Sequence, residues 1–548
     1  MLTVVNASSP AYIMIVLSAT GLALANHYVF HRHEPTKATL YRTVALLSAE
    51  PLLIYAFNYL FITHDPFSIR LLTLSYLTFF AVLSISIVLY RLSPFHPLAN
   101  VPGPALAKVS KFYGVYVWTK GQRHIHYKQL HEEYGPIVRI APNEISVTDL
   151  DAMKAVLGPG GCIKGQSYST RRDERTEGSL LALTGDARIK RRRVWARGMS
   201  TEAMREYEIA VKPLVTKLFG RLSDQAYQVI DIGEWFNYFS FDFSVEIAFG
   251  GGSFMLNQGD TAELWEAMDK FAFGIEFLSH VPWLLNLFRD LPIPKPALRI
   301  RNLGIELATK RMQQGARRKD LWYHLTDEAG LEKEKPSAGA VSSDGVLAIM
   351  AGADTTSTAL RNFFYLILAH PDCYKQLQAE IDSVYPPESD VMDTSKHGSL
   401  EYLNACLNES LRLIPPLPTG GLREVPKGCG GRMIAEHFIP EGTQVHVPHY
   451  TVQRSAENYY DPDNFIPSRW LTPTPIATEA FIPFSYGPEN CIGKHLARRV
   501  MMMVVCLLMQ NLEFKFADDF DWESWPGRIK DYFVCSREPL NVVVTPRS

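Results

Sequence analysis

Cysteine, surplus charge of one sign and repeated sequence are all scarce in this chain. The seven cysteines are scattered, and no two of them form a C-x-x-C pair. This pattern argues against a disulfide framework and against a structural zinc site, and it is typical of a reducing compartment. With a formal net charge of −2 and a pI near 6.8, the chain lacks the basic surplus of a nucleic-acid binder, so we expect no nucleic acid among its partners.

The remaining composition predicts one large domain behind an apolar N-terminal region (residues 1–92). At 61.9 kDa and 47% hydrophobic residues, the chain can bury an extensive core. Residues 135–148 alternate like a short β-hairpin, the stretch 202–413 has mostly helical periodicity, and strand patterns return after Pro415. We therefore expect a mainly α fold with a smaller β region over residues 105–548.

The N-terminal region is predicted to be a membrane anchor with up to three transmembrane helices. The uncharged stretches 11–30 and 71–90 are each long enough to cross about 30 Å of hydrocarbon as a helix. The stretch 44–62 is similarly apolar but contains Glu50 and Pro51. It is therefore either a third span or an apolar helix that lies on the membrane or against the domain.

Basic residues orient this anchor. Arg32, Lys37 and Arg42 follow the first stretch, and basic residues also follow the last. The positive-inside bias then places the loop after the first span and the main domain in the cytosol, with the N-terminus in the lumen of the endoplasmic reticulum. Four prolines within residues 93–104 exclude a helix or a central strand, which predicts a hinge between anchor and domain.

One cysteine lies in a loop suited to bind a metal. The segment 484–493 reads FSYGPENCIG and places Cys491 just before an apolar helical stretch. Its thiolate is a candidate iron ligand. Gly487 and Gly493 would let the backbone turn tightly and pass close to a flat cofactor, while Phe484 would shield the sulfur from water. The alternative is an ordinary buried cysteine near a turn.

Two further segments have an unusual composition for a helix. Residues 351–356 read AGADTT, which combines small residues that lower helix propensity with an acid and alcohols in an apolar setting. A helix kink with hydroxyl groups bonded to the preceding turn is the ordinary explanation. Further along, Glu409 and Arg412 are spaced i, i+3 and so share one helix face, and Arg469 follows in the segment 467–470, PSRW.

In order and composition these segments resemble motifs of the cytochrome P450 family, over residues 92–547. The cysteine segment matches F-x-x-G-x-R-x-C-x-G, except that Glu489 stands where the family has arginine. The second segment matches A-G-x-D/E-T-T without departure. The last two match E-x-x-R and P-x-R-W/F, with Ser468 in place of the commoner glutamate.

The resemblance implies the P450 fold and a haem b cofactor with Cys491 as its axial iron ligand. Thr355 would hydrogen-bond the distal oxygen of bound O₂, and Asp354 would pass protons to it from solvent. Glu409, Arg412 and Arg469 would form a buried network that fixes the cysteine loop. The implied reaction is monooxygenation, with one oxygen atom inserted into the substrate and the other leaving as water.

The resemblance also assigns partners to the haem propionates. Arg423 occupies the place of a propionate-binding arginine, and Trp195 matches the tryptophan of a helical W-x-x-x-R, whose arginine position holds Met199. Glu489 would repel a propionate by on the order of 1 kcal/mol at an effective dielectric near 20. It must therefore turn to a cation, for which the nearby sequence offers Lys494 or Arg498.

Electrons would come from NADPH through NADPH–cytochrome P450 reductase, with cytochrome b5 as a second candidate donor. Clustered basic side chains are either a solvated face or a docking site for such an acidic partner. The residues concerned are Arg188, Lys190, Arg191, Arg192, Arg193, Arg197, Lys494, Arg498 and Arg499.

The substrate is expected to be a lipophilic small molecule, by analogy a terpenoid or other fungal secondary metabolite. An apolar stretch is either core or a membrane-dipping entry lid, and it contains Phe271, Phe273, Phe277, Trp283 and Phe288. Two alternatives stay open. The first is a haem-thiolate isomerase or dehydratase that needs no external electrons, against which the Asp354–Thr355 pair argues. The second is a membrane-anchored haem-binding protein without turnover, which only Glu489 favours.

Overall fold

The structure is a computed structural model that describes residues 10–32, 40–63, 68–171, 177–284, 292, 294–315, 318–387, 389–471 and 477–547. These residues are mainly helical with a smaller β region, as predicted. They divide into two compact units: the first comprises 1–111, 139–143 and 281–291, and the second 112–138, 144–280 and 292–548. Two residues used in the sequence argument, Lys37 and Phe288, lie outside the described residues.

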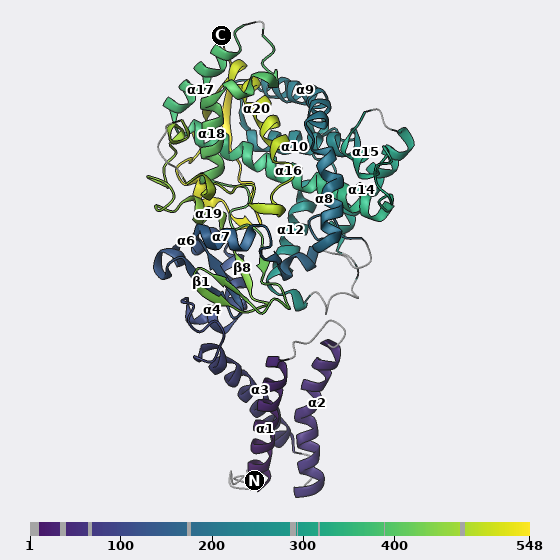
Figure 1. Ribbon diagram of the computed structural model, residues 1–548, viewed down its shortest axis with the longest axis vertical. Coiled ribbons are helices and arrows are strands. Elements are labelled where there is room, and N and C mark those ends of the chain that lie inside the picture. The colour runs from purple at the N-terminus through teal and green to yellow at the C-terminus, as the bar shows by residue number, and fades with distance from the viewer. Residues whose placement is uncertain are drawn as a thin grey trace. The chain divides into compact units, whose positions relative to one another are not determined.

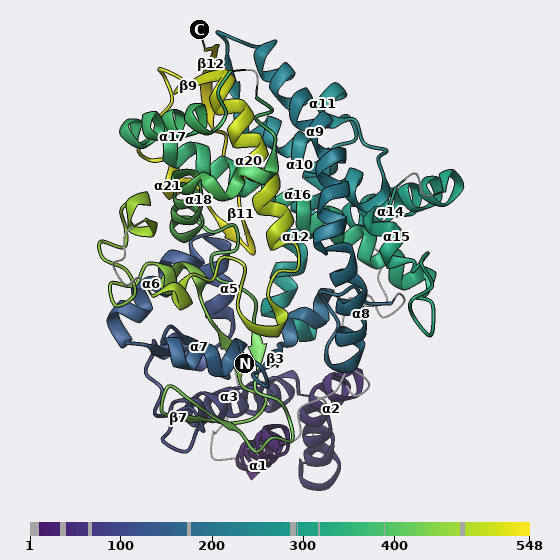
Figure 2. The same ribbon diagram turned by 45° about the horizontal axis from the view of Figure 1, so that its top comes forward.

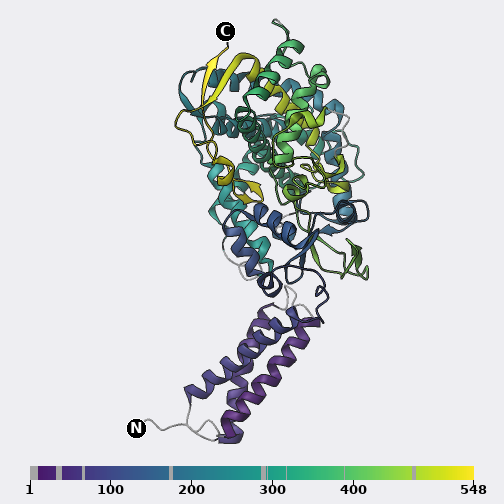
Figure 3. The same cartoon turned by 90° about the vertical axis from the view of Figure 1, so that its left-hand side faces the viewer.

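Three apolar helices pack side by side in the first unit (Figure 3). They are α1 (Pro10–Arg32), α2 (Leu40–Asn58) and α3 (Ile69–Leu92), and α2 continues into a π-helical turn, Tyr59–Thr63. Each is long and apolar enough to cross a membrane. The middle stretch, for which Glu50 and Pro51 left open a span or an apolar helix on the membrane or the domain, is thus also long and apolar enough to span.

The neighbouring helices bind polar groups of α2 around Pro51. In this bundle the Ser75 hydroxyl on α3 donates to the Pro51 carbonyl at 2.7 Å, and Asn26 on α1 donates to the Glu50 carboxyl group at 2.6 Å. Neighbouring helices therefore satisfy the polar groups that α2 carries into an apolar setting.

The proline-rich segment 93–104 forms neither helix nor strand, as predicted, and leads into the short helix α4 (Ala105–Val109). The two strands predicted within residues 135–148 are present as β1 (Ile137–Ala141) and β2 (Glu144–Val147).

Helices build most of the second unit (Figure 1). They are α5 (Phe112–Thr119), α6 (Arg123–Tyr134), α7 (Leu150–Leu157), α8 (Gly185–Gly198), α9 (Thr201–Ser223), α10 (Ile232–Phe249), α11 (Met255–Gln258), α12 (Leu264–His280), α14 (Lys295–Gln314), α15 (Leu321–Leu325), α16 (Ala338–Leu368), α17 (Pro371–Val384), α18 (Glu401–Leu413), α19 (His449–Gln453), α20 (Lys494–Asn511) and α21 (Trp525–Arg528).

The strands of this unit are short. β2, β8 (Gln444–His446), β5 (Arg423–Glu424) and β3 (Ile163–Lys164) are neighbours in that order, with β2 and β8 parallel and the other pairs antiparallel. A second antiparallel sheet has the order β4-β12-β9, and two hairpins pair β6 with β7 and β10 with β11. Their bounds are β4 Val229–Asp231, β6 Arg432–Ile434, β7 His437–Ile439, β9 Leu512–Phe516, β10 Asp531–Tyr532, β11 Val534–Cys535 and β12 Asn541–Pro546.

Helix α16 runs through the middle of the second unit and packs closely on α10 (Figure 2). The Ser337 hydroxyl accepts a hydrogen bond from the Ala340 amide and starts the helix, which ends just before Pro371. A Cβ at Gly345 would lie 2.6 Å from the Phe249 ring, and one at Gly352 would lie 2.7 Å from the Ser244 hydroxyl. The small residues of α16 thus permit the close crossing with α10.

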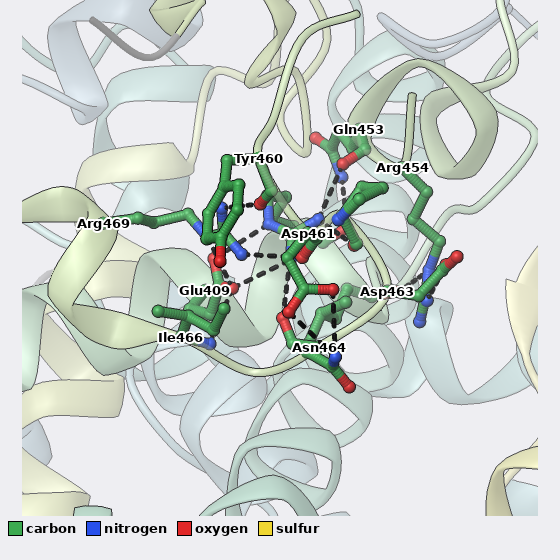
Figure 4. A network of polar contacts seen from close by, with 12 residues as sticks. Glu409, Gln453, Arg454, Tyr460, Asp461, Asp463, Asn464, Ile466 and Arg469 are labelled. Atoms are coloured by element: carbon green, nitrogen blue, oxygen red, sulfur yellow. Dashed lines mark hydrogen bonds and ion pairs between the residues drawn. The ribbon is translucent and has the colours of Figure 1, made fainter. Parts of the chain in front are cut away.

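The buried carboxylate of Glu409 ties α18 to the segment 466–470 (Figure 4). Glu409 accepts two hydrogen bonds from Arg412, both at 2.8 Å, and one from Arg469 at 3.0 Å. It also accepts from the Ile466 amide and the Trp470 indole. The three-residue network implied by the family resemblance is therefore confirmed.

One glutamine carries this network to the start of the cysteine segment. Arg412 donates to the Gln453 carbonyl, while the Gln453 amide group donates to the carbonyls of Leu411 and Arg412. The side-chain oxygen of Gln453 then accepts from the Ile482 amide at 2.9 Å. The sequence argument did not identify Gln453, whose role depends on contacts far apart in the chain.

We expect Glu409→Ala to destabilise the fold by about 3–5 kcal/mol, because it leaves two buried guanidinium groups without their carboxylate. Burial by itself would raise the pKa of Glu409, but the hydrogen bond and charge of Arg412 outweigh it and hold that pKa below its ordinary value. Glu409 therefore stabilises the protein above its unfolded pKa, and the contribution is lost as the pH falls through the folded value. Denaturant unfolding against Glu401→Ala, an exposed residue of the same helix, measures the effect; equal losses in both variants would contradict it.

Candidate functional site

The second unit encloses a cavity of about 980 Å³ between α16 and the cysteine segment, walled mostly by apolar side chains. Seven of the eight predicted site residues line it; Gly487 is not among the lining residues. The seven come from α8, α16, β5 and the loop before α20, and they are Trp195, Asp354, Thr355, Arg423, Phe484, Cys491 and Gly493.

A hydrogen bond within its own loop positions Cys491. Its amide donates to the Phe484 carbonyl at 2.8 Å, which closes the loop and brings Phe484 and Cys491 to the same cavity. Desolvation raises the pKa of the Cys491 thiol, against the opposing effects of the Gly493 amide and the Arg192 and Lys494 charges. A positively charged metal would reverse this balance and favour the thiolate.

The two glycines of the loop serve different purposes. Gly487 has φ +72°, and a Cβ there would lie 2.0 Å from the Leu157 carbonyl oxygen. The tight turn therefore requires a glycine here, as predicted. The close contact is with the end of α7, however, and not with the cavity. Gly493 lines the cavity, and a Cβ there would meet no atom within 4 Å. The space beside Cys491 is therefore open.

On α16 the acid and the alcohol both reach the cavity wall. Thr355 Oγ1 donates to the Ala351 carbonyl at 2.7 Å, which is the back-bond that the simpler interpretation of this segment described. The bond orients the hydroxyl and leaves its lone pairs to accept from the cavity. Asp354 lies beside it, with one carboxylate oxygen bound to Arg537 at 2.6 Å.

The propionate assignment on α8 needs correction. The Trp195 indole donates to Asp344 at 2.8 Å, so this donor is already used inside the protein. Arg188 and Arg192, which precede Trp195 on the same helix, line the cavity instead. Arg192 also binds the backbone and side-chain oxygens of Asn490. The helix therefore does supply cations to the cavity, although Met199 does not.

Glu489 turns inward to a cluster of cations. The prediction that it pairs with Lys494 or Arg498 is therefore wrong. Its carboxylate lies 2.7 Å from Arg423, 3.4 Å from Arg188 and 3.7 Å from Lys164. Arg498 instead donates to Asn404 and Asn408. Sequence reasoning missed Lys164, which β3–β5 pairing places opposite Arg423.

The surroundings of Lys164 make its ammonium group unusually acidic for a lysine. Desolvation, together with the neighbouring arginines and against the opposing effect of Glu489, lowers its pKa to about 8. Glu489 therefore helps to keep Lys164 protonated in a site that already holds Arg423, Arg188 and Arg192. The cluster still has more cations than acids, which suits a dianionic ligand.

The aromatic stretch near α12 divides between separate roles. Phe271 lines the cavity, whereas Phe273 and Phe277 pack on Trp118. Trp283 belongs to the first unit and is 46% exposed. The stretch is thus part cavity wall, part packing and part surface.

Comparison with known proteins decides the family. The family model of cytochrome P450 matches residues 104–533. The chain belongs to the cytochrome P450 family. A cytochrome P450 monooxygenase of Aspergillus oryzae is 31% identical over 88% of this chain and 95% of the relative. The tryprostatin B 6-hydroxylase of Aspergillus fumigatus is 31% identical over 86% and 84%, and the averantin hydroxylase of Dothistroma septosporum 30% identical over 85% and 90%. This P450 is therefore an oxidoreductase that incorporates oxygen.

The family implies a haem-thiolate cofactor, and the residues around the cavity fit it. Cys491 supplies a sulfur donor, and Gly493 leaves open space beside it. The buried Nε of Arg423 has no hydrogen-bond partner within the described residues. It could therefore donate to a propionate oxygen. Lys164, Arg188 and Arg192 add the positive charge that two propionates need.

Docking of an electron donor at the basic cluster stays a prediction. Arg191 binds Asp344, Arg197 binds Asp327 and Arg499 binds Glu208. Arg193 pairs with Glu332 but keeps 64% of its side chain exposed. Together with Arg188, Arg192 and Arg498 in the contacts above, most of this basic cluster already has acceptors inside the protein.

Cys491→Ser should abolish thiolate ligation, because a neutral hydroxyl is a poor donor to haem iron. The reduced carbonyl complex of the wild type should show the red-shifted Soret band of a thiolate haem, and the variant should lose it. Cys429→Ser, at an exposed cysteine between β5 and β6, is the control. An unchanged band in Cys491→Ser would assign the ligand to another residue.

We expect Glu489→Gln to slow haem loss, because it removes a carboxylate that competes with the propionates for Arg423 and Arg188. At about 1 kcal/mol for the like-charge repulsion, the rate should fall about fivefold. Haem transfer to apomyoglobin measures the rate, with Glu479→Gln as an exposed control on the preceding segment. Faster loss in Glu489→Gln would mean that the carboxylate holds the arginines in place more than it repels the propionates.

Proposed function

We propose that this P450 hydroxylates or epoxidises a lipophilic secondary metabolite, with electrons delivered from NADPH through NADPH–cytochrome P450 reductase. The observation that carries the proposal is the meeting of Cys491, Asp354 and Thr355 on one largely apolar cavity. Two relatives are named as hydroxylases of tryprostatin B and averantin, which supports hydroxylation but does not select one scaffold. A terpenoid therefore stays one candidate within the wider class.

Each predicted site residue has a role in this proposal. When bound, the haem supplies the activation of O₂, and its thiolate ligand favours cleavage of the O–O bond. Cys491 would hold the iron, and Phe484, which lines the same cavity, would shield the sulfur from water. Thr355 Oγ1 accepts and passes on a proton at the cavity face of α16, and Asp354 supplies that proton from solvent. Arg423 with the α8 arginines binds the propionates, while Trp195 braces α8 through Asp344.

We also propose that the chain is anchored in the endoplasmic reticulum membrane. Residues 1–92 would form the anchor with three spans, 93–104 the hinge and 105–548 the catalytic domain. The three apolar helices support the spans. The positive-inside bias supports a cytosolic catalytic domain, where reductase and cytochrome b5 have access to it.

The alternatives are less well supported by the same cavity. An isomerase or dehydratase has no use for an acid–alcohol pair that delivers protons to reduced oxygen, and both members face the cavity here. A non-catalytic haem-binding protein was favoured only by Glu489. The arginines around that carboxylate compensate its charge, so it no longer argues against turnover.

Thr355→Ala should retain haem but divert electrons into hydrogen peroxide, because protons are no longer directed at the distal side. We expect product formed per NADPH consumed to fall by about tenfold or more. The ratio is measured with peroxide release at fixed reductase, against Thr309→Ala, which removes a similar helix back-bond on α14. An unchanged ratio would favour the isomerase alternative.

Microsomes that contain this P450 and a reductase, incubated with terpenoid, alkaloid, polyketide and fatty-acid substrates, test the overall function. The expected product carries one atom from isotopically labelled O₂ and requires NADPH. Product formation without NADPH, or without the label, would overturn monooxygenation in favour of the isomerase.

A further inference from the structure

An arginine near the C-terminus holds the acid that faces the cavity. Arg537 lies between β11 and β12, and only 9% of its side chain is exposed. Its Nη1 donates to Asp354 at 2.6 Å, and its Nη2 donates to Asp269 on α12. Asp354 is 16% exposed whereas Asp269 is 61% exposed. One guanidinium group thus joins a carboxylate of the cavity wall to a carboxylate in solvent.

The surroundings keep this guanidinium in place but leave it two acceptors. Arg537 lies over the Trp265 ring at 4.5 Å, a favourable stacking contact. Within the described residues, the other groups that interact electrostatically with Asp354 are Arg361, two turns along α16, and the Cys535 thiol. Burial raises the pKa of Asp354 and so does Asp269, while Arg537 and Arg361 lower it.

We propose that Arg537 is a positioning residue that determines when Asp354 can pass a proton into the cavity. The inference rests on the proposed monooxygenase function. With Nη1 on Asp354, the ion pair keeps that group a carboxylate. When the guanidinium is held by Asp269 alone, Asp354 can take a proton from water on a carboxylate oxygen. Asp354 then gives that proton to the Thr355 hydroxyl oxygen, whose own hydroxyl proton passes into the cavity, and Asp354 returns to the carboxylate without any transfer of electrons.

Two substitutions should change the Asp354 carboxyl in opposite directions. Arg537→Gln removes the cation that favours the carboxylate, so the pKa of Asp354 should rise. Asp269→Asn removes a like charge and the competing acceptor of Arg537, so the pKa of Asp354 should fall. Infrared titration of the carboxyl band, identified by its loss in Asp354→Asn, measures both without turnover. Arg537→Lys keeps the positive charge and should stay closer to the wild type than Arg537→Gln.

The pH dependence of catalysis should shift in the same directions as the pKa of Asp354. The pH at which product per NADPH falls by half on the alkaline side should move up in Arg537→Gln and down in Asp269→Asn. Glu266→Gln is the matched control, because it removes an acid from α12 that pairs with Lys270 instead. A role of Arg537 in stability alone would lower yield or thermal stability and leave both pH profiles unmoved.

The outcomes separate this inference from the proposed function. If the infrared pKa of Asp354 is the same in Arg537→Gln, Asp269→Asn and wild type, the positioning role is wrong even where NADPH-dependent product is formed. If the pKa shifts as expected but Asp354→Asn leaves product per NADPH unchanged, the positioning role is also wrong, because Asp354 relays no proton. Failure of every substrate to yield labelled product overturns the monooxygenase function, while the titration still reports on the ion pair.

Discussion

The shared carboxylate of Glu409 is the constraint on which the site depends. It pairs with both Arg412 and Arg469 in a buried site, and such a group is costly to bury unless every partner is in place. Because Arg412 also binds the Gln453 carbonyl, and Gln453 binds the Ile482 amide, the same network reaches the backbone two residues before Phe484. The loop that presents Cys491 is thereby tied to α18, although the chain between them is long.

A second constraint acts on Glu489, within that loop. Lys164, Arg188 and Arg423 would repel one another in an enclosed cavity, and Glu489 lies among them. An acid at this position thus has a physical purpose in the protein as described, since it offsets like charge. The same acid opposes an anionic ligand, so this P450 has an internal balance between stability of the site and affinity for the propionates.

Local motifs determined much of this protein without tertiary information. Cys491 between two glycines, the acid–alcohol pair on an apolar helix and the i, i+3 spacing of Glu409 and Arg412 each carry their chemistry within a few residues. The long apolar N-terminal stretches likewise predicted helices, because the hydropathy of a segment follows from its own residues alone. These features led to the family and the mainly α fold, and both are confirmed.

Other features depended on partners that only the tertiary structure supplies. The three residues of β4 become a strand because β12, far along the chain, pairs with them, and local periodicity gave no sign of it. The donor of Trp195 went to Asp344, and Glu489 turned to Lys164, Arg188 and Arg423 rather than to nearby cations. Local sequence determines which helix a residue belongs to. The ion pairs of a charged side chain depend instead on which charges lie near it in the folded protein, and these charges come together only when β3, β5 and α8 pack.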